Sequence, residues 1–255
     1  MDMIFSYWGT GHRPFTSLQM AAISNHLAKQ HGHKTHLYAD KSGLELFKNI
    51  EFDYRIELDT NTLSKLPVRV WSLGKLLAIS QHRAPFLHID FDLMLFKDIP
   101  PEKLSQDFLC AHPEYWFQFD RNCYQKHSAK LNIIAPRPYS HNCCIVGGNK
   151  YTEINSAAET ILNYCIENKA EIEADCEKYQ TKLAWLIPCL FEQTFFVNLV
   201  RNKLNLVKIP VVFDEINIDN LYEKFRSSNI VHQWGQKILT HELYDKHITK
   251  NNIKY

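Results

Sequence analysis

Asp90 and Asp92 are the residues of this sequence whose types and spacing most clearly predict chemistry. They follow the most apolar segment of the chain, residues 86–89, which predicts a buried strand. Side chains two positions apart in a strand point to the same side, so we expect the two carboxylates to converge. Two ionised carboxylates repel each other unless a cation neutralises them, and oxygen ligands favour Mg²⁺ or Mn²⁺. The pair therefore predicts a divalent metal site that binds phosphate groups; the alternative is two solvated aspartates in a loop.

The segments before this pair alternate between short apolar runs and helical periodicity, a β-α-β-α-β order. We expect strands at 3–8, 35–39 and 54–58, helices at 14–30 and 43–49, and a further helix at 70–81 that leads into the strand at 86–89. Such an order predicts parallel strands covered by helices. In open α/β sheets, ligands bind beyond the carboxyl ends of the strands, which is where the two aspartates are expected.

The second half of the chain is less regular. We expect strands at 108–111 and 143–146 and helices at 151–167 and 193–201. The segment 113–140 is expected to be a loop, and its many aromatic residues form either a wall of a substrate site or a plug over a secondary core. No composition break marks a second domain.

The composition of the 255 residues is that of a globular protein. With 29 lysines and arginines against 28 aspartates and glutamates, the formal net charge is +1, so no overall field favours nucleic acid or an anionic membrane. Seven cysteines show neither metal-ligand nor disulfide spacing and are expected to be reduced and mostly buried. Because the sequence shows neither a signal-peptide pattern nor an apolar run long enough to span a membrane, we expect a cytoplasmic protein without a transmembrane segment.

The stretch from Phe86 to Ile99 resembles the D-x-D region of GT-A-fold glycosyltransferases, in which this motif binds a divalent metal and a nucleotide sugar. The resemblance extends over residues 3–237 and implies an α/β protein with the GT-A fold, a single Rossmann-like, mixed and mainly parallel sheet flanked by helices. It also implies one domain over residues 1–255, with a nucleotide-sugar-binding half (1–100), an acceptor and donor-sugar half (101–240) and a tail (241–255).

Three further segments match the family in order along the chain. Lys75, in the helix ahead of the D-x-D motif, matches a basic residue that reaches the donor; the alternative is a lysine that extends to solvent. Asn142 opens a strand similar to the one beneath the transferred sugar. Glu192 and Gln193 match the acidic–Gln pair beside the donor sugar in the retaining galactosyltransferase-like branch, glycosyltransferase families 8 and 32. The alternative for this pair is the start of a helix, where an acidic residue complements the dipole.

The C-terminal segment 232–237 is similar to that branch's H-x-x-G-x-x-K segment, whose histidine is the third metal ligand and whose lysine contacts the diphosphate. The resemblance thus assigns His232 to the metal and Gly235 and Lys237 to the donor. This sequence departs from the family in two places, since the spacing from Gly235 to Lys237 is one residue shorter than usual and Glu192 replaces the more common aspartate. The chain has 13 histidines, so the alternative for His232 is an ordinary surface or packing residue.

Residues after the first two strands correspond to the place where the family binds the nucleotide base and ribose. Tyr7, Trp8 and Thr10 follow the first strand, where nearby glycines permit close approach of the backbone to a ligand. Asp40 ends the second strand and is expected either to hold the base or to be a turn residue.

The resemblance implies a metal-dependent glycosyltransferase that moves a hexose-type sugar from a nucleotide sugar, in this family a UDP-sugar, to a hydroxyl of a saccharide or glycan acceptor, with retention. Mn²⁺ or Mg²⁺ stabilises the departing diphosphate, and Glu192 or Gln193 lies near the anomeric carbon as stabiliser or, for Glu192, as nucleophile. An inverting enzyme would need a general base, for which His112 and Glu114 are positional candidates. The sequence leaves two other functions open: a metal-dependent phosphohydrolase or nucleotidyltransferase, and a non-catalytic UDP-binding subunit. The tail 245–255 is either a peripheral membrane contact or a frayed end.

Overall fold

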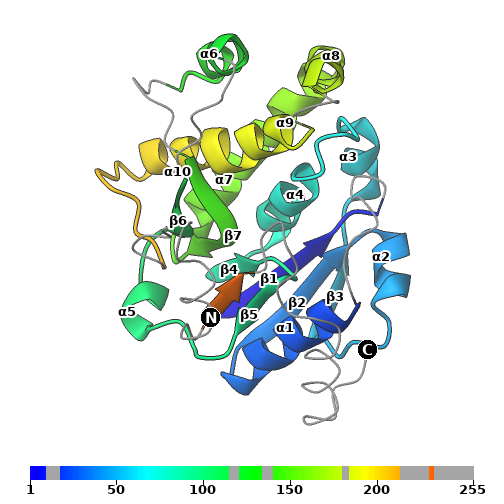
Figure 1. Ribbon diagram of the computed structural model, residues 1–255, viewed down its shortest axis with the longest axis vertical. Coiled ribbons are helices and arrows are strands. Elements are labelled where there is room, and N and C mark those ends of the chain that lie inside the picture. Colours follow the sequence, from blue (N-terminus) through cyan, green and yellow to red (C-terminus); the bar gives the residue numbers. More distant parts are fainter. Residues whose placement is uncertain (10–17, 115–120, 134–139, 180–183, 213–229, 233–255) are drawn as a thin grey trace.

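The computed structural model describes residues 1–9, 18–114, 121–133, 140–179, 184–212 and 230–232 (Figure 1). Its strands are β1 (Asp2–Tyr7), β2 (Lys34–Ala39), β3 (Tyr54–Glu57), β4 (Phe86–Ile89), β5 (Leu93–Leu95), β6 (Leu109–Glu114), β7 (Ser140–Gly148) and β8 (Ile230–His232). Its helices are α1 (Leu18–Gln30), α2 (Lys41–Leu46), α3 (Thr60–Lys65), α4 (Leu73–Gln81), α5 (Pro101–Leu104), α6 (Arg121–Lys130), α7 (Tyr151–Glu167), α8 (Lys169–Tyr179), α9 (Leu186–Cys189), the π-helix η1 (Leu190–Phe196) and α10 (Val197–Lys203).

A six-stranded sheet of order β3-β2-β1-β4-β7-β6 forms the centre of the molecule. The pairs β1–β2, β1–β4 and β2–β3 are parallel, whereas β7 runs antiparallel to both of its neighbours. Strands β5 and β8 form a second, two-stranded sheet. The α/β class with a mixed, mainly parallel sheet flanked by helices is therefore confirmed.

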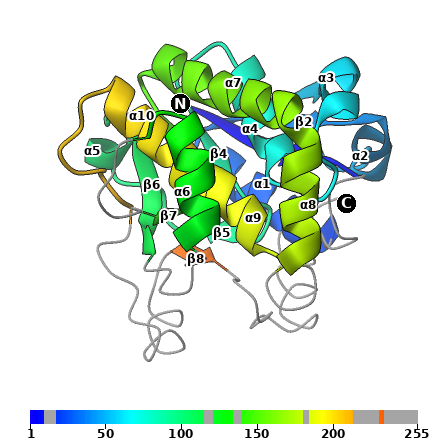
Figure 2. The ribbon, with the colours of Figure 1, turned by 90° about the horizontal axis from the view of Figure 1, so that it is seen from above.

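Two apolar cores cover the two faces of the sheet, and successive residues of β1 alternate between them. Ile4 belongs to the core formed with α4 and α7, while Met3 and Phe5 belong to the core formed with α1 and β5. Seen from above, α4 and α7 lie next to each other (Figure 2). This alternation is the two-residue period of a strand that is buried on both faces.

The carboxyl ends of β1, β2, β4 and β6 lie at one edge of the sheet, and antiparallel β7 begins there. The strand order reverses between β1 and β4, because β2 and β3 extend to one side of β1 and β4 to the other. Ligands in open α/β sheets bind at such a reversal point. The segments that follow β1 and β4, from Trp8 and from Asp90, therefore flank the expected binding position.

Three structural expectations need correction. The segment 113–140 is not only loop, because it contains α6; this helix is polar and buries a narrow stripe that includes Cys123 and His127, so its apolar periodicity is weak. The helix expected at 193–201 begins earlier, as η1, and continues as α10. Helix α8 was not expected, because only Ile172 and Cys176 are buried on it.

The apolar content of the chain is used for its cores. All seven cysteines are buried and free, as expected. Among the residues that the structure describes, no helix has both the length and the apolar character needed to cross a bilayer.

Candidate functional site

The two aspartates of the D-x-D motif lie in a tight turn between β4 and β5. The Asp90 N–H donates to the carbonyl of Cys144 at 2.9 Å, which continues the pairing of β4 with β7 by one residue. The Leu93 N–H then donates to the Asp90 carbonyl at 3.0 Å and closes the turn. The expectation that strand geometry aligns Asp90 and Asp92 was therefore wrong, because the strand ends at Ile89 and a turn positions both residues. Both side chains are half-buried.

A buried lysine connects Asp90 to a second carboxylate. The Lys75 Nζ lies 2.6 Å from Asp90 Oδ1 and 2.5 Å from Glu192 Oε1, and it donates a hydrogen bond to the carbonyl of Cys143 at 3.0 Å. Lys75 comes from α4, Glu192 from η1 and Cys143 from β7, so three elements meet at one ammonium group. The alternative that Lys75 extends to solvent is excluded, since its side chain is 7% exposed.

The charges of this cluster depend on one another. Burial alone lowers the pKa of Lys75, but the adjacent carboxylates of Asp90 and Glu192 outweigh burial and raise it above its ordinary value. Lys75 therefore stays protonated. Burial raises the pKa of Glu192, the Lys75 charge opposes this shift, and the Asp90 charge adds to it. The second oxygen of Glu192, Oε2, is buried and has no hydrogen-bond partner among the described residues.

The π-helix η1 positions the Glu192–Gln193 pair. A π-helical segment inside a longer helix widens the turn and is frequent at functional sites. Every residue of η1 is buried, including the polar Glu192, Gln193 and Thr194. The interpretation of Glu192 as a residue that only begins a helix is wrong, because α9 precedes η1 without a break and the Glu192 carboxylate contacts Lys75.

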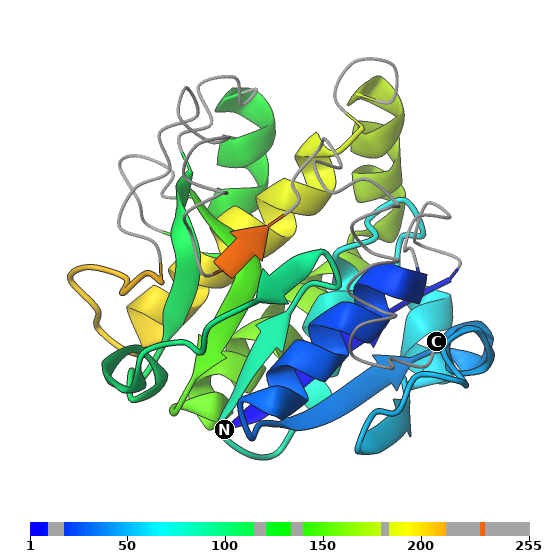
Figure 3. The same ribbon diagram turned by 60° about the horizontal axis from the view of Figure 1, so that its bottom comes forward.

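The backbone of His232 lies next to the D-x-D turn. Strand β8 pairs antiparallel with β5, and the register sets His232 opposite Leu93, the residue after Asp92 (Figure 3). Two segments 139 positions apart in the sequence, from Leu93 to His232, are thus brought together at the carboxyl edge of β4. Gly235 and Lys237 lie outside the described residues.

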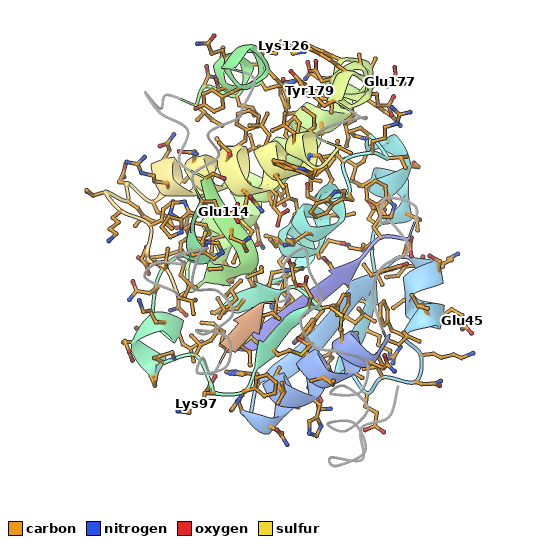
Figure 4. The ribbon with its side chains drawn as sticks, viewed as in Figure 1. Glu45, Lys97, Glu114, Lys126, Glu177 and Tyr179 are labelled. Atoms are coloured by element: carbon orange, nitrogen blue, oxygen red, sulfur yellow. The ribbon has the colours of Figure 1, made fainter. Side chains whose placement is uncertain are left out.

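The start of β7 and the end of β6 place further polar groups at the same edge. Asn142 is buried; its Nδ2 donates to Glu114 Oε1 at 2.6 Å, and its Oδ1 accepts the N–H of Cys144 at 2.9 Å. Figure 4 shows Glu114 on β6, beside the neighbouring strand β7. The Nδ1 of His112 lies 3.0 Å from the carbonyl of Pro113.

The segment after β1 is held by Asp40. Its Oδ2 accepts the Gly9 N–H at 2.8 Å and its Oδ1 accepts the Gly43 N–H at 2.8 Å, so Asp40 caps α2 and fixes the end of β1. Trp8 is 2% exposed and packs against α4 where Gly74 leaves room, since a Cβ on Gly74 would lie 2.8 Å from the Cβ of Trp8. Burial and the Asp40 charge raise the pKa of Tyr7. Thr10 lies outside the described residues.

Sequence reasoning missed His88, a buried histidine inside the apolar strand β4. Its Nε2 lies 2.8 Å from Ser6 Oγ on β1, and its Nδ1 lies 3.7 Å from Asp90 Oδ1. His88 is the register partner of Ile4, which belongs to the core on the α4 side of the sheet, so His88 lies on that side, where Lys75 also lies. A polar residue in an otherwise apolar strand was the signal available in the sequence.

Solved glycosyltransferases show a weak similarity to this chain. A galactosyltransferase, LgtC, in complex with donor and acceptor sugar analogs is 11% identical, with 80% of this chain and 70% of that chain covered and a TM-score of 0.39. Mouse xyloside xylosyltransferase 1 in its apo form is 12% identical over 80% and 82% of the two chains, with a TM-score of 0.39. The PaToxG glycosyltransferase is 10% identical over 99% and 84%, with a TM-score of 0.41.

The sequence itself matches a family model over almost its whole length. No curated protein matches the chain. The matching model, described as "Family of unknown function (DUF6734)", covers residues 8–252, which include Lys75, the D-x-D turn and Glu192. The chain is therefore a member of the DUF6734 family of unknown function.

Proposed function

We propose that this protein is a metal-dependent glycosyltransferase that transfers a sugar from a nucleotide-sugar donor to a hydroxyl of a saccharide or glycan acceptor. The observation that carries the proposal is the pairing of β5 with β8, which sets His232 beside the D-x-D turn at the carboxyl edge of β4. The resemblance of both segments to GT-A-fold glycosyltransferases supports it, because the fold joins two motifs that are far apart in the sequence. The position beside the reversal of strand order supports a nucleotide ligand at this edge.

The donor groups at this turn suit a hard divalent cation. Asp90 and Asp92 supply carboxylate oxygens, and His232, whose backbone lies beside them, would supply an imidazole nitrogen. Lys75 contacts Oδ1 of Asp90, which leaves the other oxygen of that carboxylate to a cation. Mn²⁺ or Mg²⁺ bound there would neutralise the charge of the departing nucleoside diphosphate.

Lys75 is proposed to act on the donor side of the reaction. Its ammonium is already held by two carboxylates and the Cys143 carbonyl, so it would fix Asp90 toward a bound cation without reorganising when the donor arrives. Glu192 is 2% exposed and tied to Lys75, a geometry that supports a positioning role for this carboxylate rather than the nucleophilic role considered from the sequence. Glu192 would keep Lys75 charged and thereby hold Asp90 in place.

Gln193 and Asn142 are proposed to contact the donor sugar. Gln193 follows Glu192 in η1, and Asn142 lies near the start of β7, directly before the residue whose carbonyl binds Lys75. A neutral amide beside the anomeric carbon stabilises developing charge without forming a covalent bond. The sequence resemblance supports retention and a UDP-sugar donor. Tyr7, Trp8 and Asp40 are proposed to shape the base and ribose site, with Asp40 acting through Gly9.

The first test is a panel of nucleotide sugars measured by thermal shift with Mn²⁺ and with chelator, followed by assays of donor hydrolysis. A ligand that binds only the folded state raises Tm, so we expect one UDP-sugar to stabilise the protein only when Mn²⁺ is present. Asp92→Asn is expected to abolish this shift. Asp98→Asn is the matched control, since this nearby aspartate is paired with His33 at 2.8 Å.

Other outcomes of the same panel would overturn the proposal. If no nucleotide sugar raises Tm in a metal-dependent way, the proposed metal-dependent glycosyltransferase function is refuted. Hydrolysis of phosphomonoesters without any effect of nucleotide sugars would identify a phosphohydrolase, and UDP binding without donor turnover under any acceptor would identify a non-catalytic UDP-binding subunit.

A further inference from the structure

A second cluster of potential metal ligands lies at the opposite edge of the sheet from the D-x-D turn. Asp2 is the first residue of β1, His36 is the third residue of β2, and His82 follows the last residue of α4. The parallel register pairs Ile4 with His36, so Asp2 and His36 are diagonal neighbours on one face of the sheet. Helix α4 covers that face and delivers His82 to the same point.

The three side chains converge on one carboxylate oxygen. Asp2 Oδ2 lies 3.2 Å from His36 Nε2 and 3.3 Å from His82 Nε2. Both imidazoles are buried, with side-chain exposures of 11% and 4%. Neither Nε2 makes a hydrogen bond of acceptable geometry within the described part of the chain. Two buried nitrogens without a hydrogen bond are costly unless another group satisfies them.

Neighbouring groups fix the orientation of both rings. Tyr38 Oη lies 2.9 Å from His82 Nδ1, which leaves Nε2 of His82 to face Asp2. The Tyr54 ring stacks on His36 with 4.5 Å between ring centroids, and the two imidazoles meet edge to face at 5.0 Å. A hydrogen bond to the second nitrogen of an imidazole is the usual way in which proteins orient a metal-binding histidine.

The protonation state of the cluster also suits a cation. Both imidazoles have little exposed side-chain surface, and burial disfavours their charged forms. A neutral imidazole and an ionised carboxylate are the forms that bind metals.

We propose that Asp2, His36 and His82 form a binding site for a borderline divalent transition metal, with Zn²⁺ the best fit. Ligand atoms around tetrahedral Zn²⁺ lie about 3.3–3.5 Å apart at its usual bond lengths, and the two nitrogen–oxygen distances here are close to that range. Two nitrogen ligands disfavour Mg²⁺ and Ca²⁺. The side chain of Asp2 is 22% exposed, so solvent provides both an entry path and the fourth ligand.

In a similar cluster on the other side of the molecule, both histidine nitrogens have partners within the protein. Cys123, His127 and Asp175 also lie close enough to share an ion. There both nitrogens of His127 have partners, with Tyr164 Oη at 2.6 Å and Asp175 Oδ2 at 2.9 Å, and Lys126 Nζ lies 2.5 Å from the same oxygen of Asp175. Figure 4 shows Lys126 on α6, at the end of the molecule formed by α6 and α8. This second cluster needs no metal.

The test measures Co²⁺ and Zn²⁺ binding to untagged, chelator-treated protein that carries Asp92→Asn, which weakens the D-x-D site. Co²⁺ is expected to give the intense visible absorption of tetrahedral coordination, and Zn²⁺ is expected to displace it. Zn²⁺ at about one hundred times its Kd is expected to raise Tm by roughly 5–10 °C.

Single substitutions then locate the site. Asp2→Asn and His82→Gln, each in the Asp92→Asn background, are expected to lose the Co²⁺ spectrum. Asp2→Asn is nearly isosteric at a partly exposed side chain, so the fold is retained, as far-UV circular dichroism would verify. His33→Gln is the matched control, because His33 lies 2.8 Å from the single carboxylate of Asp98. Absence of a tetrahedral Co²⁺ spectrum in the Asp92→Asn protein, or a spectrum unchanged by Asp2→Asn and by His82→Gln, would overturn the proposal.

Discussion

Among the described contacts of Glu192, Lys75 carries the only charge that neutralises its buried carboxylate. Replacing Lys75 with methionine removes that charge. Methionine fills a similar volume, so the main change is electrostatic. Breaking a buried ion pair by removing one partner typically costs about 3–5 kcal/mol, because the remaining charge stays buried without a partner. We expect Lys75→Met to lower the free energy of unfolding by this amount at pH 7, since Glu192 is 2% exposed and its Oε1 lies 2.5 Å from Lys75.

The loss is expected to depend on pH in a defined direction. Without Lys75, the pKa of Glu192 rises further above its unfolded value, so the folded state binds more protons than the unfolded state above about pH 4.5. The stability of Lys75→Met relative to the wild type therefore falls as pH rises, by up to about 1.4 kcal/mol per pH unit until the folded-state pKa is passed. Urea unfolding at several pH values between 5 and 7 measures both quantities.

Two further variants complete the test. Adding Glu192→Gln to Lys75→Met is expected to restore part of the stability at pH 7, because it removes the unpaired charge. Lys29→Met is the control for an exposed pair: Lys29 Nζ lies 3.0 Å from Asp53 Oδ1 with both side chains about one third exposed, and its loss is expected to cost less than about 1 kcal/mol. A loss below about 1 kcal/mol for Lys75→Met at pH 7, or one that does not shrink toward pH 5, would refute the reasoning.

Three other predictions concern stability and can be checked by urea unfolding. Gly147→Ala is expected to cost roughly 3 kcal/mol or more, because Gly147 has φ +155° and an added Cβ would collide with the Phe86 carbonyl oxygen. Gly32→Ala, at φ +79° with open space around it, should cost about 1–2 kcal/mol. Equal costs for the two substitutions would contradict the steric argument. Burial lowers the pKa of His141 to about 4, so the unfolded state binds more protons than the folded state between about pH 4 and 6.5. The free energy of unfolding therefore falls as pH decreases through this range. His141→Leu should flatten this part of the stability–pH curve, and an unchanged slope would exclude His141 as its cause. Asp40→Ala should cost about 1–2 kcal/mol, because it removes the cap of α2 and the acceptor of a β1 loop amide, and a cost near zero would argue against both contacts.

The order of strands and helices up to Asp90 could be predicted, except for α3, because the other elements there carry their own periodic signal. Helix α3 lacks this signal, since Leu63 is its one buried residue. Residues 86–89 form a buried central strand, as their continuous apolar run indicates. The helix at 151–167 also has the predicted bounds, because its apolar residues recur at helical spacing. Helix α6 lacked such a signal, since residues such as His127 are buried through polar contacts that only the folded chain provides.

The structure brings Lys75, Asp90 and Glu192 of the sequence-predicted site together, but their contacts could not be predicted from the sequence. Lys75 and Glu192 were each recognised through family resemblance, yet nothing in the sequence shows that they contact each other across 117 positions. Their contact depends on how α4 and η1 pack against β7, a tertiary arrangement without local signal. His88 escaped notice for the same reason, because its partner Ser6 lies 82 positions away.

The pairing of β6 with β7 has a consequence for how this family can diversify. Glu114 and Ser140 are register partners, so the chain between them leaves and re-enters the sheet at the same place. Because both ends of this segment are fixed in the sheet, the entropic cost of closing the segment grows only with the logarithm of its length. Insertions and deletions between these two anchors that leave the packed helix α6 intact can therefore accumulate at little thermodynamic cost, while the strand ends that carry Glu114 and Asn142 stay fixed. Under the proposed glycosyltransferase function, acceptor recognition would then evolve by changes in this segment, independently of the donor-binding chemistry.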